Sequence, residues 1–172
     1  VMEIDHITLN ADGSVTVEDH GPWYACRKHK SGVSTLEVIF TVLHAGGKFT
    51  SSGGYQSAGG LHGVGASVVN ALCSWCKVTV HDGKMYGPCC LKMGKESRKT
   101  GEIGKTNRTG STVQFLPESH IFKQNRFSFS KICERAQEDA FLLEGLEMKV
   151  TDLRKEKREM VYQYENGLTG FY

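Results

Sequence analysis

No stretch of this 172-residue chain is apolar for long enough to span a membrane, and no signal peptide is recognisable. Its charge is also close to balanced, with 21 lysines and arginines against 19 aspartates and glutamates. A net charge of +2 does not by itself indicate a nucleic-acid surface. Because 39% hydrophobic and 23% charged residues are ordinary values for a globular protein, we expect one soluble, cytoplasmic domain over residues 1–172.

The chain lacks the cysteine spacing of a metal centre. Cys73 and Cys76 form a Cys-x-x-Cys pair, but Cys89 and Cys90 are adjacent and supply no second pair for a zinc ribbon. A thioredoxin-type pair follows a strand and opens a helix, whereas we expect this pair to close a helix. We therefore interpret the six cysteines as free thiols in a reducing compartment, and we predict no metal ligands.

Glycine is concentrated in one stretch. Eight glycines fall between Gly46 and Gly65, which excludes a core helix or strand because glycine loses backbone entropy and buries no side chain. The next residues, 66–72, have the apolar periodicity of a helix. A glycine-rich loop that leads into a helix presents backbone N–H groups and the positive end of the helix dipole, so it predicts a phosphate site. Lys48 favours this interpretation over a surface loop that contacts nothing.

The spacing excludes two familiar phosphate loops. There is no Gly-x-x-x-x-Gly-Lys-Ser/Thr sequence, and Gly60-x-x-Gly63-x-Gly65 is not the Gly-x-Gly-x-x-Gly of a dinucleotide fold. Residues 43–49 and 57–72 instead closely resemble the ATP lid and phosphate loop of the B subunits of bacterial type IIA topoisomerases, DNA gyrase and topoisomerase IV. These subunits share an ATPase superfamily with Hsp90, histidine kinases and MutL. The resemblance covers nearly the whole chain, and the final strands look closer to topoisomerase IV.

Apolar periodicity predicts the other elements. We expect a β-hairpin over 4–18, strands at 77–81, 84–92, 109–117, 147–152 and 160–164, helices at 33–44 and 130–143, and a loop at 94–108. In the last helix, Ile132, Ala136, Ala140 and Leu143 should face inward, and Gly145 should end it. The resemblance implies an α+β fold of the Bergerat type: a two-layer α/β sandwich whose mixed, mostly antiparallel sheet carries helices on one face.

The resemblance also assigns nucleotide-binding residues. Asp19, followed by Gly21, matches the aspartate that accepts the adenine amino group, although alone it reads as a turn residue. Ser111 keeps the hydroxyl that binds adenine together with that aspartate and a water. Lys48 would contact a phosphate, and Tyr55 would lie against the adenine. The loop residues expected to hold the β- and γ-phosphates are Gly60, Leu61, His62, Gly63, Val64 and Gly65.

The match is interrupted after Asp19, where the family's Arg-Gly-x-Pro is replaced by Pro22-Trp23-Tyr24-Ala25. A divergent scaffold with an occluded pocket, or a non-catalytic nucleotide-binding module, is therefore an alternative. Ahead of Asp19 we find no glutamate and asparagine one helical turn apart, the pair with which the family activates water and holds Mg²⁺. We expect a fragment of the ATPase domain without its N-terminal helix, which binds ATP weakly, contains no catalytic residue and does not hydrolyse ATP.

In the intact subunit, the resemblance implies a topoisomerase that binds ATP and Mg²⁺ and uses ATP to pass one DNA duplex through another. It implies ATP-dependent homodimerisation and partnership with the A subunit, and DNA contacts through other domains.

Overall fold

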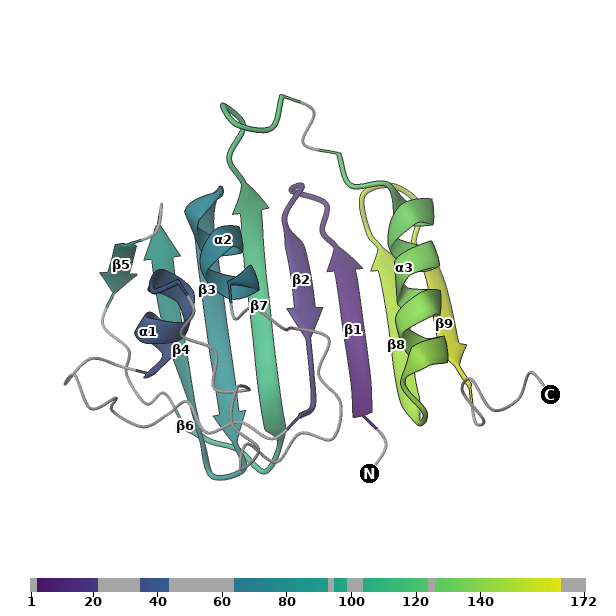
Figure 1. Cartoon of the computed structure of the whole chain (residues 1–172), viewed down its shortest axis with the longest axis horizontal. Coiled ribbons are helices and arrows are strands. Elements are labelled where there is room, and N and C mark those ends of the chain that lie inside the picture. Colours follow the sequence, from purple (N-terminus) through teal and green to yellow (C-terminus); the bar gives the residue numbers. More distant parts are fainter. Residues whose placement is uncertain are drawn as a thin grey trace.

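The computed structural model describes residues 3–21, 35–43, 64–92, 95–98, 104–123 and 126–164. Within these residues, nine strands form one sheet that carries three helices (Figure 1). The strands are β1 (Glu3–Leu9), β2 (Val15–Glu18), β3 (Cys73–Asp82), β4 (Met85–Lys92), β5 (Lys95–Arg98), β6 (Gly104–Lys105), β7 (Thr109–Pro117), β8 (Leu146–Asp152) and β9 (Arg158–Gln163). The helices are α1 (Thr35–Thr41), α2 (Gly65–Ala71) and α3 (Phe129–Leu142).

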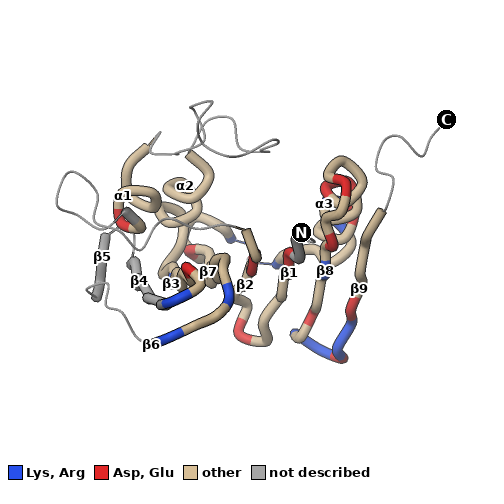
Figure 2. Tube along the Cα trace, turned by 90° about the horizontal axis from the view of Figure 1, so that it is seen from below, with Lys and Arg blue, Asp and Glu red and all other residues tan. Residues whose placement is uncertain are grey.

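The sheet is mixed and mostly antiparallel. Its order is β5-β4-β3-β7-β2-β1-β8-β9, and β6 pairs with β4. Only the β1–β8 pair is parallel among the described strand pairs. Figure 2 shows the three helices on the same side of the sheet. The predicted two-layer α+β sandwich is confirmed, and so is the hairpin, in which β1 pairs with β2.

The core lies between the sheet and the helices in two apolar clusters. One lies beneath α1 and α2 and comprises Leu36, Phe40, Cys76, Val78 and Val80. The other lies beneath α3 and comprises Cys133, Ala136, Ala140, Leu146, Met148 and Val150. Burying a Val, Leu, Phe or Met side chain contributes about 1.5–3 kcal/mol, so these clusters fix each helix against its strands. In Figure 1, β1 and β2 run between the two groups of helices.

Helix α3 follows its predicted pattern except at its end. Ser128 caps its N-terminus by accepting a hydrogen bond from the Lys131 backbone N–H at 3.4 Å. Ala136 and Ala140 are buried as expected. Leu143, expected to face inward, is 37% exposed. It is the C-cap, with φ −113° and ψ 99°, so its side chain no longer follows the helical face. None of the described helices is long and apolar enough to cross a membrane.

Two other predictions are wrong. Cys73 and Cys76 do not close a helix, because α2 ends at Ala71 and both cysteines belong to β3. A register shift between Cys73 and Trp75 interrupts the strand alternation there, which explains why the pattern was missed. The expected loop at 94–108 contains β5 and β6, edge strands formed by backbone pairing with β4. As expected, Cys73, Cys76 and Cys133 are thiols outside any disulfide bond, and all three are buried.

Candidate nucleotide-binding site

Asp19 and Ser111 lie side by side at one end of the sheet, although 92 residues separate them in the sequence. The pairing of β2 with β7 continues one residue past β2, because the Asp19 backbone N–H donates to the Ser111 carbonyl at 2.9 Å. In return, the Ser111 hydroxyl donates to Asp19 Oδ2, and the Ser111 backbone N–H donates to Oδ1 at 3.3 Å. The structure therefore brings together the two side chains expected to read the adenine.

The Asp19 carboxylate also fixes the turn that follows it. The Gly21 backbone N–H donates to Oδ1 at 3.1 Å, so the turn-capping interpretation of Asp19 holds as well. An ionised carboxylate offers about four acceptor positions, and the three bonds from Ser111 and Gly21 leave about one, on Oδ2. Capping and ligand binding are thus compatible in the same side chain.

Ser111 contributes an acceptor rather than a donor. Its hydroxyl has one hydrogen, which is donated to Asp19, so the lone pairs of the oxygen stay available. Ser111 is only 2% exposed. Ser111 and Val113 are two residues apart on β7, so their side chains lie on the same face of the sheet. Val113 packs against the cluster beneath α1 and α2, so Ser111 also points to the side that carries the helices. The pair presents hydrogen-bond acceptors on that side, which suits a ligand with N–H donors.

Gly110 is a further site residue, to which the sequence pattern assigned no role. Its φ is +118°, in the region that favours glycine. A Cβ atom there would overlap the Asp19 carbonyl and lie 2.8 Å from the His20 Cα. Only glycine therefore lets the chain after β2 approach β7 closely enough for the Asp19–Ser111 contacts. The glycine before the hydroxyl residue at the start of a strand was the available signal.

Two of the predicted phosphate-loop residues are described. Val64 is the N-cap of α2 and makes no side-chain capping hydrogen bond, and Gly65 is the first helical residue. The first helical bond to the N-cap runs from the Val68 N–H to the Val64 carbonyl at 2.9 Å. A Cβ atom at Gly65 would meet no described residue within 4 Å.

The other predicted site residues lie outside the described residues. They are Lys48, Tyr55, Gly60, Leu61, His62 and Gly63, together with the divergent segment Pro22–Ala25. Within the described residues, no cluster of three or more His, Cys, Asp or Glu side chains could hold a metal ion. The described side chains therefore do not form a magnesium site of their own.

A cavity of about 320 Å³ lies at the other end of β7. Its walls are mainly apolar and include Phe115, Pro117, Phe122 and Phe127. Because it does not include Asp19 or Ser111, it is separate from the candidate site.

Comparisons with known proteins point to one family. No family model matches the sequence. The chain is 50% identical over 172 residues to the B subunit of DNA topoisomerase 4 from Staphylococcus aureus, covering 98% of this chain and 26% of that protein. It is 50% identical over 168 residues to the corresponding protein of Staphylococcus epidermidis, covering 96% of this chain and 25% of that protein. It matches the 43K ATPase domain of Thermus thermophilus gyrase B, solved with an aminocoumarin, with a TM-score of 0.81 and 34% identity, covering 98% of this chain and 42% of that one.

The fold thus matches that of the gyrase B ATPase domain. The chain belongs to the family of bacterial type IIA topoisomerase B subunits, as the sequence resemblance indicated. It spans about a quarter of the length of the curated relatives that it matches.

Proposed function

We propose that this chain is the ATP-binding part of a DNA topoisomerase B subunit. The observation that carries the proposal is the Asp19–Ser111 pair, which presents two acceptors on the helix side of the sheet. The 50% identity to the B subunit of topoisomerase 4 over nearly the whole chain supports the same function.

The pair favours adenine over guanine. Adenine carries an exocyclic amino group, a donor, where guanine carries a carbonyl oxygen, an acceptor. The free acceptor position of Asp19 can accept a hydrogen bond from the amino group but would repel the guanine oxygen. Losing one hydrogen bond to a charged group costs about 1.5–3 kcal/mol, which corresponds to a preference of about tenfold or more for ATP over GTP.

The triphosphate would be held by the glycine-rich loop. We assign Lys48 to a phosphate oxygen, Tyr55 to the adenine face, and the backbone N–H groups of residues 60–65 to the β- and γ-phosphates. The start of α2 supports this assignment, because Val64 makes no side-chain capping hydrogen bond and an uncapped helix N-terminus attracts anions. Mg²⁺ would enter with the nucleotide, since this ion is commonly bound through substrate phosphates and keeps several waters.

In the whole subunit, ATP binding would drive homodimerisation and the passage of one DNA duplex through another, with the A subunit as partner and other domains contacting the DNA. We place this protein in the cytoplasm, where its DNA substrate would be. The names of the relatives support these proposals, which concern a protein longer than this chain.

We further propose that this chain alone binds ATP without hydrolysing it, because every role assigned to its residues is a binding role. Steady-state phosphate release should equal that of a Lys48→Ala control. Release clearly above that control would contradict the proposal.

Titration calorimetry with non-hydrolysable ATP and GTP analogues tests nucleotide binding itself. We expect saturable binding of the ATP analogue and at least about tenfold weaker binding of the GTP analogue. If neither analogue bound at millimolar concentration, the alternative would be favoured, a divergent scaffold with an occluded pocket.

A further inference from the structure

Glu18 lies directly behind Asp19, on the other face of the same strand end. We propose that Glu18, with His6 as its pH-dependent partner, positions the Asp19–Ser111 pair from the open face of the sheet, the face opposite α1, α2 and α3. The inference rests on the proposed nucleotide binding and adds two positioning residues that lie outside the site.

The register of β2 and β7 couples the two faces. Glu18 is paired with Thr112, one step along each strand from the Asp19–Ser111 pair. Side chains alternate between faces along a strand, so Glu18 and Thr112 point away from the helices when Asp19 and Ser111 point toward them. Any movement of Glu18 at the end of β2 therefore changes where the Asp19 carboxylate lies.

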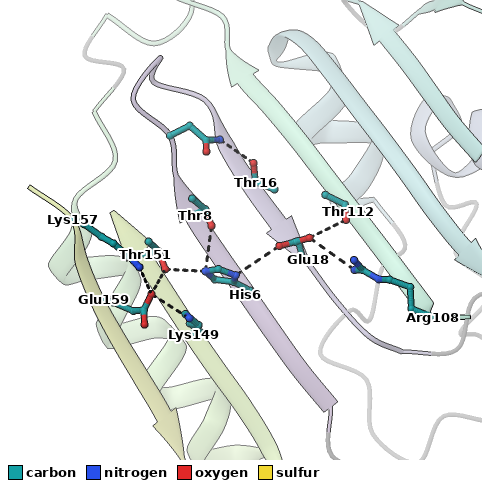
Figure 3. Close-up of polar contacts among 11 residues, drawn as sticks. His6, Thr8, Thr16, Glu18, Arg108, Thr112, Lys149, Thr151, Lys157 and Glu159 are labelled. Carbon is teal, nitrogen blue, oxygen red and sulfur yellow. Dashed lines mark hydrogen bonds and ion pairs between the residues drawn. The ribbon is translucent and has the colours of Figure 1, made fainter. Parts of the chain in front are cut away.

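Glu18 is held on the open face by contacts to both neighbouring strands (Figure 3). Its Oε1 accepts a hydrogen bond from the Thr112 hydroxyl at 3.3 Å and lies 3.9 Å from Nη2 of Arg108. Its Oε2 lies 3.7 Å from Nδ1 of His6, which is its register partner on β1. Glu18 thus ties β7 to β1 across β2 immediately behind the candidate site.

Both ring nitrogens of His6 have polar neighbours on the open face. Nε2 lies 2.9 Å from the Thr151 hydroxyl oxygen and 3.3 Å from the Thr8 hydroxyl oxygen, and the Thr151 hydroxyl also donates to Glu159 at 3.2 Å. Nδ1 faces Oε2 of Glu18. Protonation of the ring turns this contact into an ion pair.

Charged groups from four places act on His6. Glu18 on β2 and Glu159 on β9 favour the protonated ring, whereas Lys149 on β8 and Lys157 in the β8–β9 turn oppose it. Burial is the largest influence and, with Lys149, lowers the pKa of His6 below its ordinary value of 6.5. The ring is therefore neutral at neutral pH, and the Glu18 contact strengthens when the pH falls through the lowered pKa. Because His6 uses Oε2 and Thr112 uses Oε1, the new ion pair adds to the existing contact.

The first test follows backbone amides in the nucleotide-free chain. In ¹⁵N-labelled protein, the Asp19, Gly21 and Ser111 amide signals should shift between about pH 5 and pH 8, with a midpoint below that of an ordinary histidine. His20 is next to Asp19, so the comparison is with His6→Gln, which keeps a hydrogen-bond donor but cannot be protonated. The change in these amide signals that has its midpoint below that of an ordinary histidine should disappear in His6→Gln and in Glu18→Gln. The same pH-dependent change of the amide signals in both variants as in the wild type would overturn the inference.

The second test measures affinity for a non-hydrolysable ATP analogue. Glu18→Gln should weaken binding at neutral pH roughly two- to fivefold, the size expected when the partly exposed ion pair between Glu18 and Arg108 is lost. Glu159→Gln is the matched control, because it removes ion pairs to Lys149 and Lys157 on the same face but lies on β9. Its affinity should equal that of the wild type at neutral pH.

The two proposals fail separately. Equal losses in Glu18→Gln and Glu159→Gln, or no loss in Glu18→Gln, would contradict the positioning role while nucleotide binding stands. Amide shifts that depend on His6 in a chain that binds no nucleotide would support the coupling between the two faces and contradict the proposed function.

Discussion

Gly110 and Asp19 are so close that the main chain of Asp19 occupies the space where a side chain at position 110 would begin. Gly110→Ala should therefore displace the turn after β2 and destabilise the fold by about 1–3 kcal/mol, the usual cost of overpacking. The comparison is Gly65→Ala, where the added methyl group would meet none of the described residues within 4 Å. Urea denaturation should separate the two variants clearly, and equal stabilities would mean that the close approach is wrong.

Asp152 anchors the turn between β8 and β9. Its side chain is 3% exposed and accepts from Nε and Nη2 of Arg154, both at 2.9 Å, and from Nη2 of Arg158 at 2.6 Å. Nη1 of Arg154 also donates to the Phe127 carbonyl at 2.6 Å, which ties the turn to the segment before α3. Asp152→Asn should cost about 1.5–3 kcal/mol, because the bonds lost involve charged groups.

This cost should depend on pH. The hydrogen bonds from Arg154 hold the pKa of Asp152 well below its usual value of 3.8. The stabilisation is therefore complete above that value and is lost as the pH falls below it. Denaturation of the wild type and Asp152→Asn should give a difference that is constant near neutral pH and shrinks in acid. Asp139→Asn, which loses an exposed pair with Arg135, is the control and should cost less than about 0.5 kcal/mol.

The buried cysteines should resist alkylation in the folded chain. Burial raises the pKa of the Cys73 thiol from 9.0 to about 11. At mildly alkaline pH this lowers the reactive thiolate fraction about 100-fold, in addition to the steric protection. Mass spectrometry after brief iodoacetamide treatment should find Cys73 unmodified in buffer and modified in urea. Rapid modification in buffer would contradict both the burial and the interpretation of the Cys-x-x-Cys pair as structural.

Much of the fold follows from local patterns. Apolar alternation predicted β1, β2 and β7, and helical spacing predicted α3, because these elements each bury one face. Edge strands such as β5 escaped prediction because pairing with β4 uses the backbone and requires no apolar pattern. The start of β3 was missed because a register shift breaks its alternation.

The Asp19–Ser111 pair was predictable only through resemblance. Asp19 alone reads as a turn residue, and nothing local links it to Ser111, 92 residues further on. The contacts of Glu18 were not predictable either, since they depend on the register between β1, β2 and β7. Pairing across strands is a property of the assembled sheet, which local periodicity does not encode.

The most direct test of the adenine-reading pair is a double-mutant cycle on Asp19 and Ser111, with affinity for ATP and GTP analogues measured by calorimetry. Asp19→Asn and Ser111→Ala should each weaken the ATP analogue, Asp19→Asn by about tenfold or more. The double variant should lose less than the product of the single losses, because the two side chains share a hydrogen bond. Binding of ATP and GTP analogues with equal affinity, or an unchanged ATP affinity in Asp19→Asn, would contradict the assignment.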